Sequence, residues 1–534
     1  MNSDSLDSGP PDRTQLRQGI CPAGSGDRLS KIESHWPESV MRTSIPGETV
    51  HRRPGEKGLK GEALGLLSST VIGLSSTAPA YSLAVTLGLV VNLVGKKAPL
   101  IMLLGFVPIF FIAIAYRELN RAEPDCGATF TWAGRAFGPW IGWMGSWVFI
   151  TANVITMASL AQIAGSYSFR LVKANSLAES TSATTLAGVV WIVAMTVVCH
   201  RGIEISARLQ YLLLSVELVV LATFAAIALV KVYCGNAPNG SLIPTTGWLW
   251  PSGIALSDLV TAIVLAVFIY GGWDTAVAVN EESVQPRYTP GCAAVLSTLV
   301  LLVTYTLVTV ATVAFAGIGT EGLGLRNKTN ADDVFKNMGT AVFGHGVLGS
   351  TSVTLLINAV LTSAVAATLM TILPTARMAL SMAAHHALPQ RFAEIHPRFL
   401  TPTWSTWIMG IASAVFYVGF TAISKHFLAD SINAVGLLIA FYYGLTGFAC
   451  VWYYRHQLRG CDLWMKGVLP FLGGLMLFIV FIKSAVDYAD PKSGETMVFG
   501  LGGVLVIGIS VLLLGAVLML GYSWMAPAFF RGDH

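Results

Sequence analysis

Residues 268 to 283 read FIYGGWDTAVAVNEES and combine a glycine pair with three carboxylates inside an apolar run. Gly271 and Gly272 weaken a helix, because glycine costs a helix about 1 kcal/mol relative to alanine. Asp274, Glu281 and Glu282 follow within a few turns. An interrupted helix exposes amides that attract anions and carbonyls that attract cations. The stretch therefore predicts a site where main-chain dipoles bind a small charged molecule.

A second interrupted stretch, LLSSTVIGLSSTAPAYSLAV, lies near the start of the apolar region. It contains Gly73, a Ser-Ser-Thr run and Pro79, and proline removes a main-chain donor and costs a helix about 3 kcal/mol. Single breaks of this kind also serve close packing or a simple kink in membrane helices. Two breaks that face each other suit a zwitterion, which carries a carboxylate and an ammonium close together.

The residues predicted to bind this molecule lie in the two breaks: Ile72, Gly73, Leu74, Ser75, Ser76, Thr77, Phe268, Ile269, Tyr270, Gly271 and Trp273. The amides of residues 73–75 are expected to take the carboxylate, and the carbonyls of residues 72 and 268–270 the ammonium. The hydroxyls of residues 75–77 are expected to contribute. The rings of Phe268 and Trp273 are either lids over an ammonium or lipid-facing packing.

The elements that must position these residues are membrane-spanning helices. The chain has 534 residues, of which 54% are hydrophobic and only 12% charged, against about 25% charged in soluble domains. Roughly 20 apolar residues cross the hydrocarbon core as a helix. The sequence contains twelve such runs: about 63–90, 98–118, 140–169, 185–200, 208–231, 257–280, 291–317, 346–373, 403–423, 430–453, 466–486 and 498–522. We therefore predict an all-α polytopic membrane protein with twelve transmembrane helices.

The two breaks fall in the first and sixth runs, five spans apart. Broken helices at corresponding places in two halves are typical of secondary transporters with inverted repeats. We predict a five-plus-five inverted-repeat fold, with repeat one over 61–232 and repeat two over 233–455. Residues 456–534 then hold the last two helices and a short cytoplasmic end, and the polar residues 1–60 form a largely disordered tail.

The charges indicate an orientation. With both termini cytoplasmic, 22 of the 33 Lys and Arg residues lie on the inner side, as the positive-inside rule favours. We expect a protein of the cytoplasmic (plasma) membrane with the lipid bilayer as its surroundings and no nucleic-acid partner. The seven cysteines are scattered, and only Cys234 falls clearly in an outer loop. No metal-ligand spacing, cofactor motif or catalytic constellation emerges, so we expect no cofactor, no metal and no enzyme.

The sixth-run motif resembles the sixth-helix signature of the amino acid–polyamine–organocation superfamily of transporters. GATFTWAGRAFGPWIGWMGSW (127–147) resembles the stretch that enters the third helix of that superfamily, and TARMALSMAAHHALPQRFAEIHPRFLTPTW (375–404) the segment after the eighth. With TVIGLSSTAP, the similarity extends from about residue 60 to 455. The resemblance implies the inverted-repeat fold, alternating access and amino acids or related amines as substrates. It departs from the family where a Gly-Ser-Gly break would stand, which here reads Gly73-Leu74-Ser75.

Glu217 stands about where several proton-coupled relatives carry a lysine in the fifth helix. A buried carboxyl can carry a proton or can tie helices together as a permanently protonated group. We expect Glu217 to couple transport to H⁺, with exchange or Na⁺ coupling as alternatives. In the second case Thr362 and Ser363 would be Na⁺ ligands.

Other polar residues at membrane depth either line the pocket or form interhelical hydrogen bonds: Asn153, Asp274, Asn358, Thr362, Ser363 and Tyr442. Asp274 is expected either to attract a cationic group or to cap the second half of its helix. Glu281 and Glu282 are expected to form gate ion pairs with Arg135 or Arg377. Since few acids fall in the predicted core, neutral substrates are favoured over polyamines.

We expect a secondary active transporter of amino acids or small amines. A membrane sensor that binds the same ligand without moving it is the alternative of a different class, and the absence of any signalling domain disfavours it.

Overall fold

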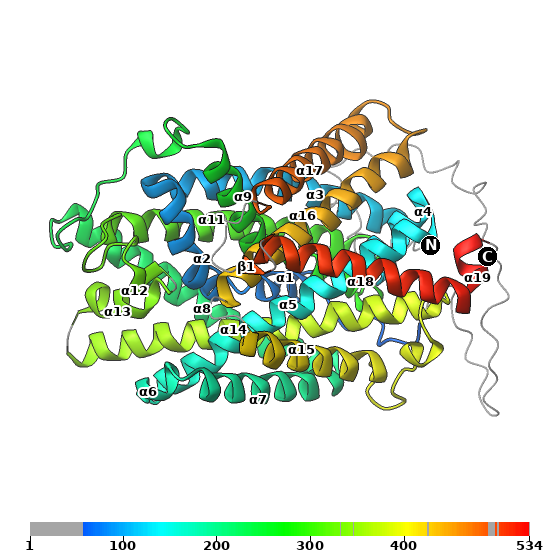
Figure 1. Ribbon diagram of the computed structural model, residues 1–534, viewed down its shortest axis with the longest axis horizontal. Coiled ribbons are helices and arrows are strands. Elements are labelled where there is room, and N and C mark those ends of the chain that lie inside the picture. The colour runs from blue at the N-terminus through cyan, green and yellow to red at the C-terminus, as the bar shows by residue number, and fades with distance from the viewer. Residues whose placement is uncertain are drawn as a thin grey trace, which may run out of the picture. The chain divides into compact units, whose positions relative to one another are not determined.

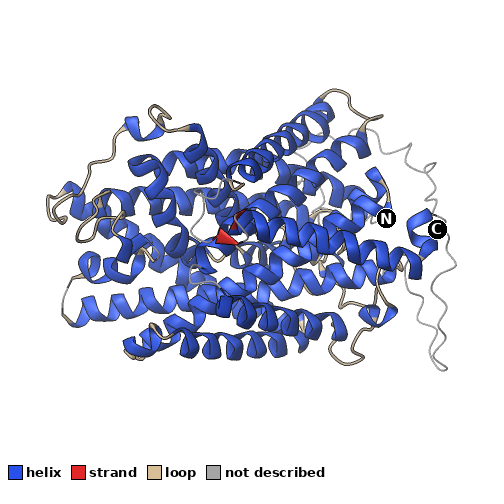
Figure 2. Cartoon of the chain, in the orientation of Figure 1, coloured by secondary structure: helices blue, strands red, loops and turns tan. Residues whose placement is uncertain are grey.

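The computed structural model describes residues 57–331, 333–344, 346–423, 427–489, 497–498 and 501–532. About 79% of this described chain is helical, as Figure 2 illustrates. The strands β1 (Met497–Val498) and β2 (Leu501–Gly502) are two residues long and pair antiparallel. The predicted all-α class is therefore confirmed. The predicted disordered tail lies almost entirely outside the described residues.

Nineteen α-helices, four short 3₁₀-helices and one short π-helix are present in the described chain, and Figure 1 shows their arrangement. Those before the second glycine-rich break are α1 (Leu66–Ser76), α2 (Pro79–Val94), α3 (Ala98–Ala122), α4 (Thr129–Phe137), α5 (Pro139–Leu171), α6 (Asn175–Ala178), α7 (Thr181–His200), α8 (Ile203–Tyr233) and α9 (Leu256–Tyr270). Those after it are α10 (Thr275–Ala278), α11 (Thr289–Ala316), α12 (Lys328–Ala331), α13 (Phe335–Phe343), α14 (Val347–Ala384), α15 (Thr403–Ile423), α16 (Phe427–Tyr454), α17 (Leu469–Asp487), α18 (Gly503–Met525) and α19 (Pro527–Arg531).

Eleven segments of the described chain are long and apolar enough to cross a membrane. Ten of them coincide with ten predicted runs, from Pro139–Leu171 to Gly503–Met525. The first, Leu66–Ala122, is 57 residues long and contains α1, α2 and α3, so it covers the other two predicted runs. The chain is thus a polytopic helical membrane protein. A total of twelve crossings requires the first segment to cross twice, and that number stays a prediction.

The packing of the helices brings the two interrupted segments together. α1 packs against α8, α11 and α14, and also against the short helix α10 that follows the second break. α2 packs against α9, which precedes that break. The long helix α14 lies beside α5 and α15 (Figure 1). Helices far apart in sequence therefore surround the place where both segments lose their helical hydrogen bonds.

Candidate functional site

The first interruption lies between α1 and α2, at Thr77 and Ala78. Ala78 has a left-handed backbone, with φ +47° and ψ 67°, a conformation that costs a residue with a Cβ about 1–2 kcal/mol. Pro79 begins α2, where its missing N–H costs nothing, and it disfavours the α conformation for the residue before it. Pro79 therefore disfavours a continuous helix through Ala78, and the first half-helix ends at Ser76. The predicted interruption of the first span is confirmed.

The second interruption covers residues 271–274, between α9 and α10. Gly271 is extended, with φ −66° and ψ 145°, and Gly272 has φ +112°, which favours glycine. The chain re-enters a helix only at Thr275, for four residues. The predicted interruption of the sixth span is confirmed at the glycine pair that the sequence indicated.

The two interruptions touch each other. Ser76 Oγ and Thr275 Oγ1 lie 2.8 Å apart in a buried hydrogen bond. A Cβ built on Gly272 would lie 2.9 Å from the carbonyl oxygen of Ser76, and one on Gly73 would lie 3.2 Å from the carbonyl oxygen of Trp273. Both glycines thus permit a close approach of the two backbones that a larger residue would prevent.

A small cavity of about 30 Å³ lies between the interruptions and three further helices. The first interrupted segment lines it with Ser76, Thr77, Ala78, Tyr81 and Ser82. The second lines it with Phe268, Gly271, Gly272, Asp274 and Thr275. The remaining wall consists of Phe149, Ala152, Asn153, Thr156 and Leu160 from α5, Thr371 from α14, and Val435, Ile439 and Tyr442 from α16. In this conformation the cavity has room for little more than one water molecule, so binding of a solute requires its walls to move apart.

Seven of the residues that the sequence singled out line this cavity: Ser76, Thr77, Asn153, Phe268, Gly271, Asp274 and Tyr442. Ten other predicted site residues are not part of its lining: Ile72, Gly73, Leu74, Ser75, Ile269, Tyr270, Trp273, Asn358, Thr362 and Ser363. The structure thus brings the glycine pair together with Ser76 and Thr77 of the first break. Residues 72–75, in the preceding helical turn, do not line the cavity.

The expected role of residues 73–75 in presenting open amides is wrong. These residues lie inside α1, which continues to Ser76, so their N–H groups belong to the helical ladder. Proline acts only on the residue before it and on the preceding turn, and a single glycine does not end a buried helix that its neighbours support. Gly73 instead allows contact with α11, where a Cβ would lie 2.7 Å from Ser297 Oγ.

Two expectations for the second break also need correction. Trp273 is not a lid: its ring is fully buried away from the cavity lining, 5.1 Å from the rings of Tyr116 and Tyr443. Asp274 occupies the N-cap position of α10 but makes no side-chain capping bond. Its Oδ1 accepts a hydrogen bond from the Tyr443 hydroxyl at 3.0 Å. The side chain lines the cavity, and its attraction of a cationic group stays a prediction.

Glu217 lies just behind the first interruption. Its Oε1 accepts a hydrogen bond from the Ala80 N–H at 2.7 Å and another from the Ser363 hydroxyl at 2.7 Å. The residue is 2% exposed, so it is buried between α8, α2 and α14. Thr362 donates instead to carbonyls of its own helix, and Asn153 does the same toward Phe149.

Sequence reasoning missed most of the α5 wall. Phe149, Ala152, Thr156 and Leu160 recur at helical spacing around Asn153, so they share one face of α5. That periodicity was the available signal for a cavity-lining face, but the same spacing is typical of any helix face that packs against other helices. The sequence could not predict that Tyr443 binds Asp274, because two adjacent tyrosines give no local signal for which of them contacts it.

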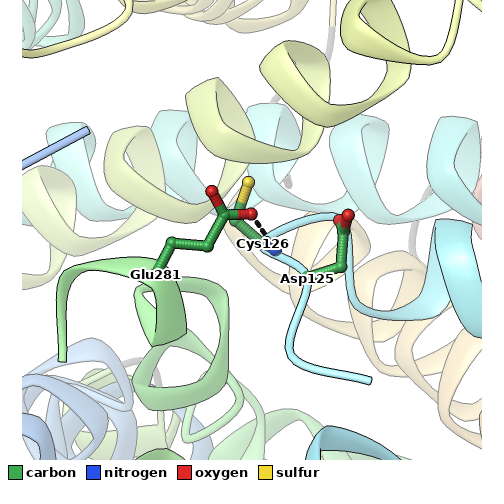
Figure 3. A group of neighbouring side chains, drawn as sticks. All are labelled: Asp125, Cys126 and Glu281. Atoms are coloured by element: carbon green, nitrogen blue, oxygen red, sulfur yellow. Dashed lines mark hydrogen bonds between the residues drawn. The ribbon is translucent and has the colours of Figure 1, made fainter. Parts of the chain in front are cut away.

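A separate group of three charged residues and one thiol, which we call the Lys57 cluster, lies at the end of the helices where α1 begins. It consists of Lys57, Asp125, Cys126 and Glu281. Lys57 Nζ lies 2.8 Å from Asp125 Oδ2, 2.5 Å from Glu281 Oε1 and 3.6 Å from Cys126 Sγ. Asp125, Cys126 and Glu281 are shown together in Figure 3, where Glu281 reaches toward the loop before α4.

The three ligand-type atoms of the Lys57 cluster lie within 4.8 Å of one another, a grouping that can hold a metal ion. Here the ammonium of Lys57 supplies the positive charge. Burial alone would lower the pKa of Lys57, but its three neighbours raise it well above its usual range. Burial alone would raise the pKa of Asp125, but Lys57 holds it well below its usual range. The cluster is therefore a charged, mutually stabilised set.

Of the four predicted gate residues, two pair with each other and two pair with residues that were not predicted as partners. Arg377 and Glu282 form a fully buried bidentate pair, with Nε–Oε2 at 2.5 Å and Nη2–Oε1 at 2.8 Å. Arg135 contacts neither predicted partner in the structure, since it pairs with Glu123 at 2.6 Å. Burial raises the pKa of Glu123 to about 7, and Arg135 acts against that rise. Glu281 pairs with Lys57, which the sequence did not single out.

The chain is similar in sequence to several known transporters. An uncharacterized transporter of Mycobacterium tuberculosis is 27% identical over 352 residues, which are 66% of this chain and 72% of that protein. The branched-chain amino acid permease BcaP of Lactococcus lactis is 24% identical over 399 residues, 70% of this chain and 78% of that protein. The methylthioribose transporter of Bacillus subtilis is 22% identical over 407 residues, 74% of this chain and 82% of that protein.

The family model described as amino acid permease matches residues 64–523, which include both interruptions, the cavity and most of the Lys57 cluster. A match of this extent identifies the family, as the motifs around the two breaks implied. The chain belongs to the amino acid permease family of membrane transporters.

Proposed function

We propose that this protein is a secondary active transporter that moves an amino acid or a related small amine by alternating access. The observation that supports this most strongly is the cavity between two interrupted helices that meet at Ser76 and Thr275. Interrupted backbone inside a membrane is tolerated where it lines a cavity or meets other protein groups. The relatives named above include an amino acid permease and a transporter of another small solute.

The proposal includes the expected architecture. The chain crosses the membrane twelve times, and residues 61–232 and 233–455 form two inverted repeats whose first helices are the interrupted ones. Residues 1–60 form a tail, and residues 456–534 add two helices. Both termini are cytoplasmic, and the protein resides in the plasma membrane. The distribution of Lys and Arg supports this orientation.

Proton coupling through Glu217 is the second part of the proposal. Its carboxyl joins α8 to the first residues of α2 and to Ser363 of α14. A proton on this carboxyl removes a negative charge from the interruption, and its loss restores that charge, so protonation changes how firmly the three helices are held together. Na⁺ is the less favoured coupling ion, and in that case the hydroxyl oxygens of Thr362 and Ser363 would be its ligands.

The ion pairs at the start of α1 serve as the gate of this proposal. The Arg377–Glu282 pair joins α14 to the residues that follow α10, and the Lys57 cluster joins the chain before α1 to two loops. The amides of Ala63 and Leu64 also donate to the carbonyl of Glu282. Opening the cavity toward this side requires these contacts to separate.

Uptake by proteoliposomes tests the proposal. The purified protein is reconstituted and supplied with labelled amino acids and amines, with and without an inward pH gradient. Accumulation of at least one solute above that of protein-free vesicles is expected, with a larger accumulation when the gradient is applied. Binding of a solute without accumulation or exchange would instead assign the protein to the sensor class.

A further inference from the structure

The cavity has one charged wall residue and no positive one. Asp274 contributes a carboxylate, whose described partner is the neutral hydroxyl of Tyr443. Lys, Arg and His are absent from the residues that line the cavity. A carboxylate in a membrane interior is costly unless an opposite charge meets it. The cavity therefore has the composition of a cation site.

Aromatic rings form much of the remaining wall. Tyr81, Phe149, Phe268 and Tyr442 all line the cavity. The rings of Phe149 and Tyr442 lie edge to face with centroids 5.2 Å apart. The faces of such rings attract ammonium and quaternary ammonium groups, more strongly where water is excluded. A carboxylate gains nothing from the faces of these rings.

The main-chain donors of the first interruption are already used by the protein. The amides of Thr77 and Ala78 donate to the carbonyls of Leu74 and Ser75. The Ala80 amide donates to Glu217 and the Tyr81 amide to Ser363 at 3.3 Å. Residue 79 is proline and has no N–H, and the amide of residue 82 donates to the carbonyl of residue 78. A substrate carboxylate at this break would find each of these amides occupied.

The second interruption offers no better site for an anion. The Gly272 amide faces the Tyr443 hydroxyl at 3.4 Å, and the Thr275 amide donates to the carbonyl of Gly272. The amides of Trp273 and Asp274 belong to the residue that carries the carboxylate and to its neighbour in the chain, so they lie near that charge. An anion bound there would meet a like charge at close range, and the cavity wall holds no cation to offset it.

We infer that the cavity accepts organic cations that lack a carboxylate, either amines or quaternary ammonium compounds, with Asp274 as the counter-charge and the aromatic rings around the cationic group. This inference rests on the proposed transport function and narrows its substrate class. It reverses the expectation of neutral substrates from the sequence, because the occupied amides and the uniformly uncharged or acidic wall appear only in the folded chain.

Matched pairs of solutes that differ by a carboxylate test the inference on the full-length protein. Choline is compared with betaine, histamine with histidine, and putrescine with ornithine, first by the shift in thermal unfolding of the purified protein and then by uptake into proteoliposomes. In at least one pair, the cation without a carboxylate is expected to bind about tenfold more tightly. Equal or tighter binding of the carboxylate-bearing member in every pair, or no binding by either member of any pair, would overturn the inference.

The two measurements separate this inference from the transport proposal. Accumulation of an amino acid with no response to amines would refute the cation preference and leave transport intact. Tight binding of choline or putrescine without accumulation or exchange would uphold the preference and refute transport.

The variant Asp274→Asn tests the assigned counter-charge. It is expected to weaken binding of the preferred cation about tenfold or more, because the neutral amide keeps the shape and removes the charge. Asp258→Asn is the matched control, since it makes the same change near the start of α9 and outside the cavity lining. Unchanged cation affinity in a folded Asp274→Asn protein would contradict the role of Asp274. If that variant does not fold, the solute pairs on the unaltered protein still decide the inference.

Discussion

Glu217 is the residue on which the proton-coupling proposal depends. Glutamine at this position can still accept the Ala80 N–H through its amide oxygen, but it cannot exchange a proton. We predict that Glu217→Gln abolishes the stimulation of uptake by an inward pH gradient, while exchange of solute across the membrane persists. For one proton, a gradient of one pH unit corresponds to about a tenfold accumulation ratio in the unaltered protein.

The measurement is initial uptake and steady-state accumulation with and without the gradient. Thr362→Ala serves as the control, because the hydroxyl of Thr362 donates only within its own helix among the described contacts. Gradient stimulation that survives in Glu217→Gln would rule out this carboxyl as the proton carrier.

The Arg377–Glu282 pair is a second prediction at the scale of residues. Both side chains are at most 1% exposed. Arg377→Met leaves the Glu282 carboxylate buried without its partner, and we predict a loss of about 3–5 kcal/mol in the free energy of unfolding. The double variant Arg377→Met/Glu282→Leu is expected to be less destabilised than the single variant, since it leaves no unpaired charge.

Unfolding in detergent as a function of denaturant concentration measures this difference in free energy. Arg135→Met is the control: Arg135 is 34% exposed, so loss of its pair with Glu123 is expected to cost only about 0–1 kcal/mol. Equal destabilisation by the two arginine variants would show that burial does not set the strength of the Arg377 pair.

At the scale of elements, the interrupted helices depend on the glycine pair between α9 and α10. Gly272 combines a φ of +112° with a backbone contact to the first interruption. We predict that Gly272→Ala lowers solute uptake at least about tenfold, because a methyl group there must push the Ser76 carbonyl away from the cavity. The measurement is uptake normalised to the amount of folded protein.

Gly65→Ala provides the comparison for the glycine substitution. A Cβ at Gly65 meets nothing within 4 Å, and its φ of −83° suits any residue. Uptake by this variant is expected to match that of the unaltered protein. If Gly272→Ala transports normally, the close approach of the two interruptions is not needed for function.

At the scale of the whole molecule, the proposed topology places native cysteines on opposite sides of the membrane. Cys234 follows α8 and Cys461 lies between α16 and α17, and both are exposed. We predict that a membrane-impermeant maleimide added to intact cells labels Cys234 but not Cys461. Permeabilised cells should show labelling of both. Labelling of both in intact cells, or of Cys461 alone, would refute twelve crossings with cytoplasmic termini.

The membrane class and the interruptions could be predicted from the sequence because both depend on local chemistry. A run of about twenty apolar residues specifies a membrane helix wherever it occurs. Pro79 disfavours the helical conformation at the residue before it, and the pair Gly271–Gly272 disfavours the helix at its own positions. These signals need no partner, so the sequence by itself determined the helical class and the two places where helices are interrupted.

The tertiary structure decided which groups remain available at those places. Ala80 and Tyr81 lose their amides to Glu217 and Ser363, which lie 137 and 282 residues away along the chain. The pairing of Glu281 with Lys57 spans 224 residues. No local pattern encodes such meetings, because they depend on how helices pack over long sequence separations. The sequence determined where the backbone opens, and the packing determined what charge the opening can accept.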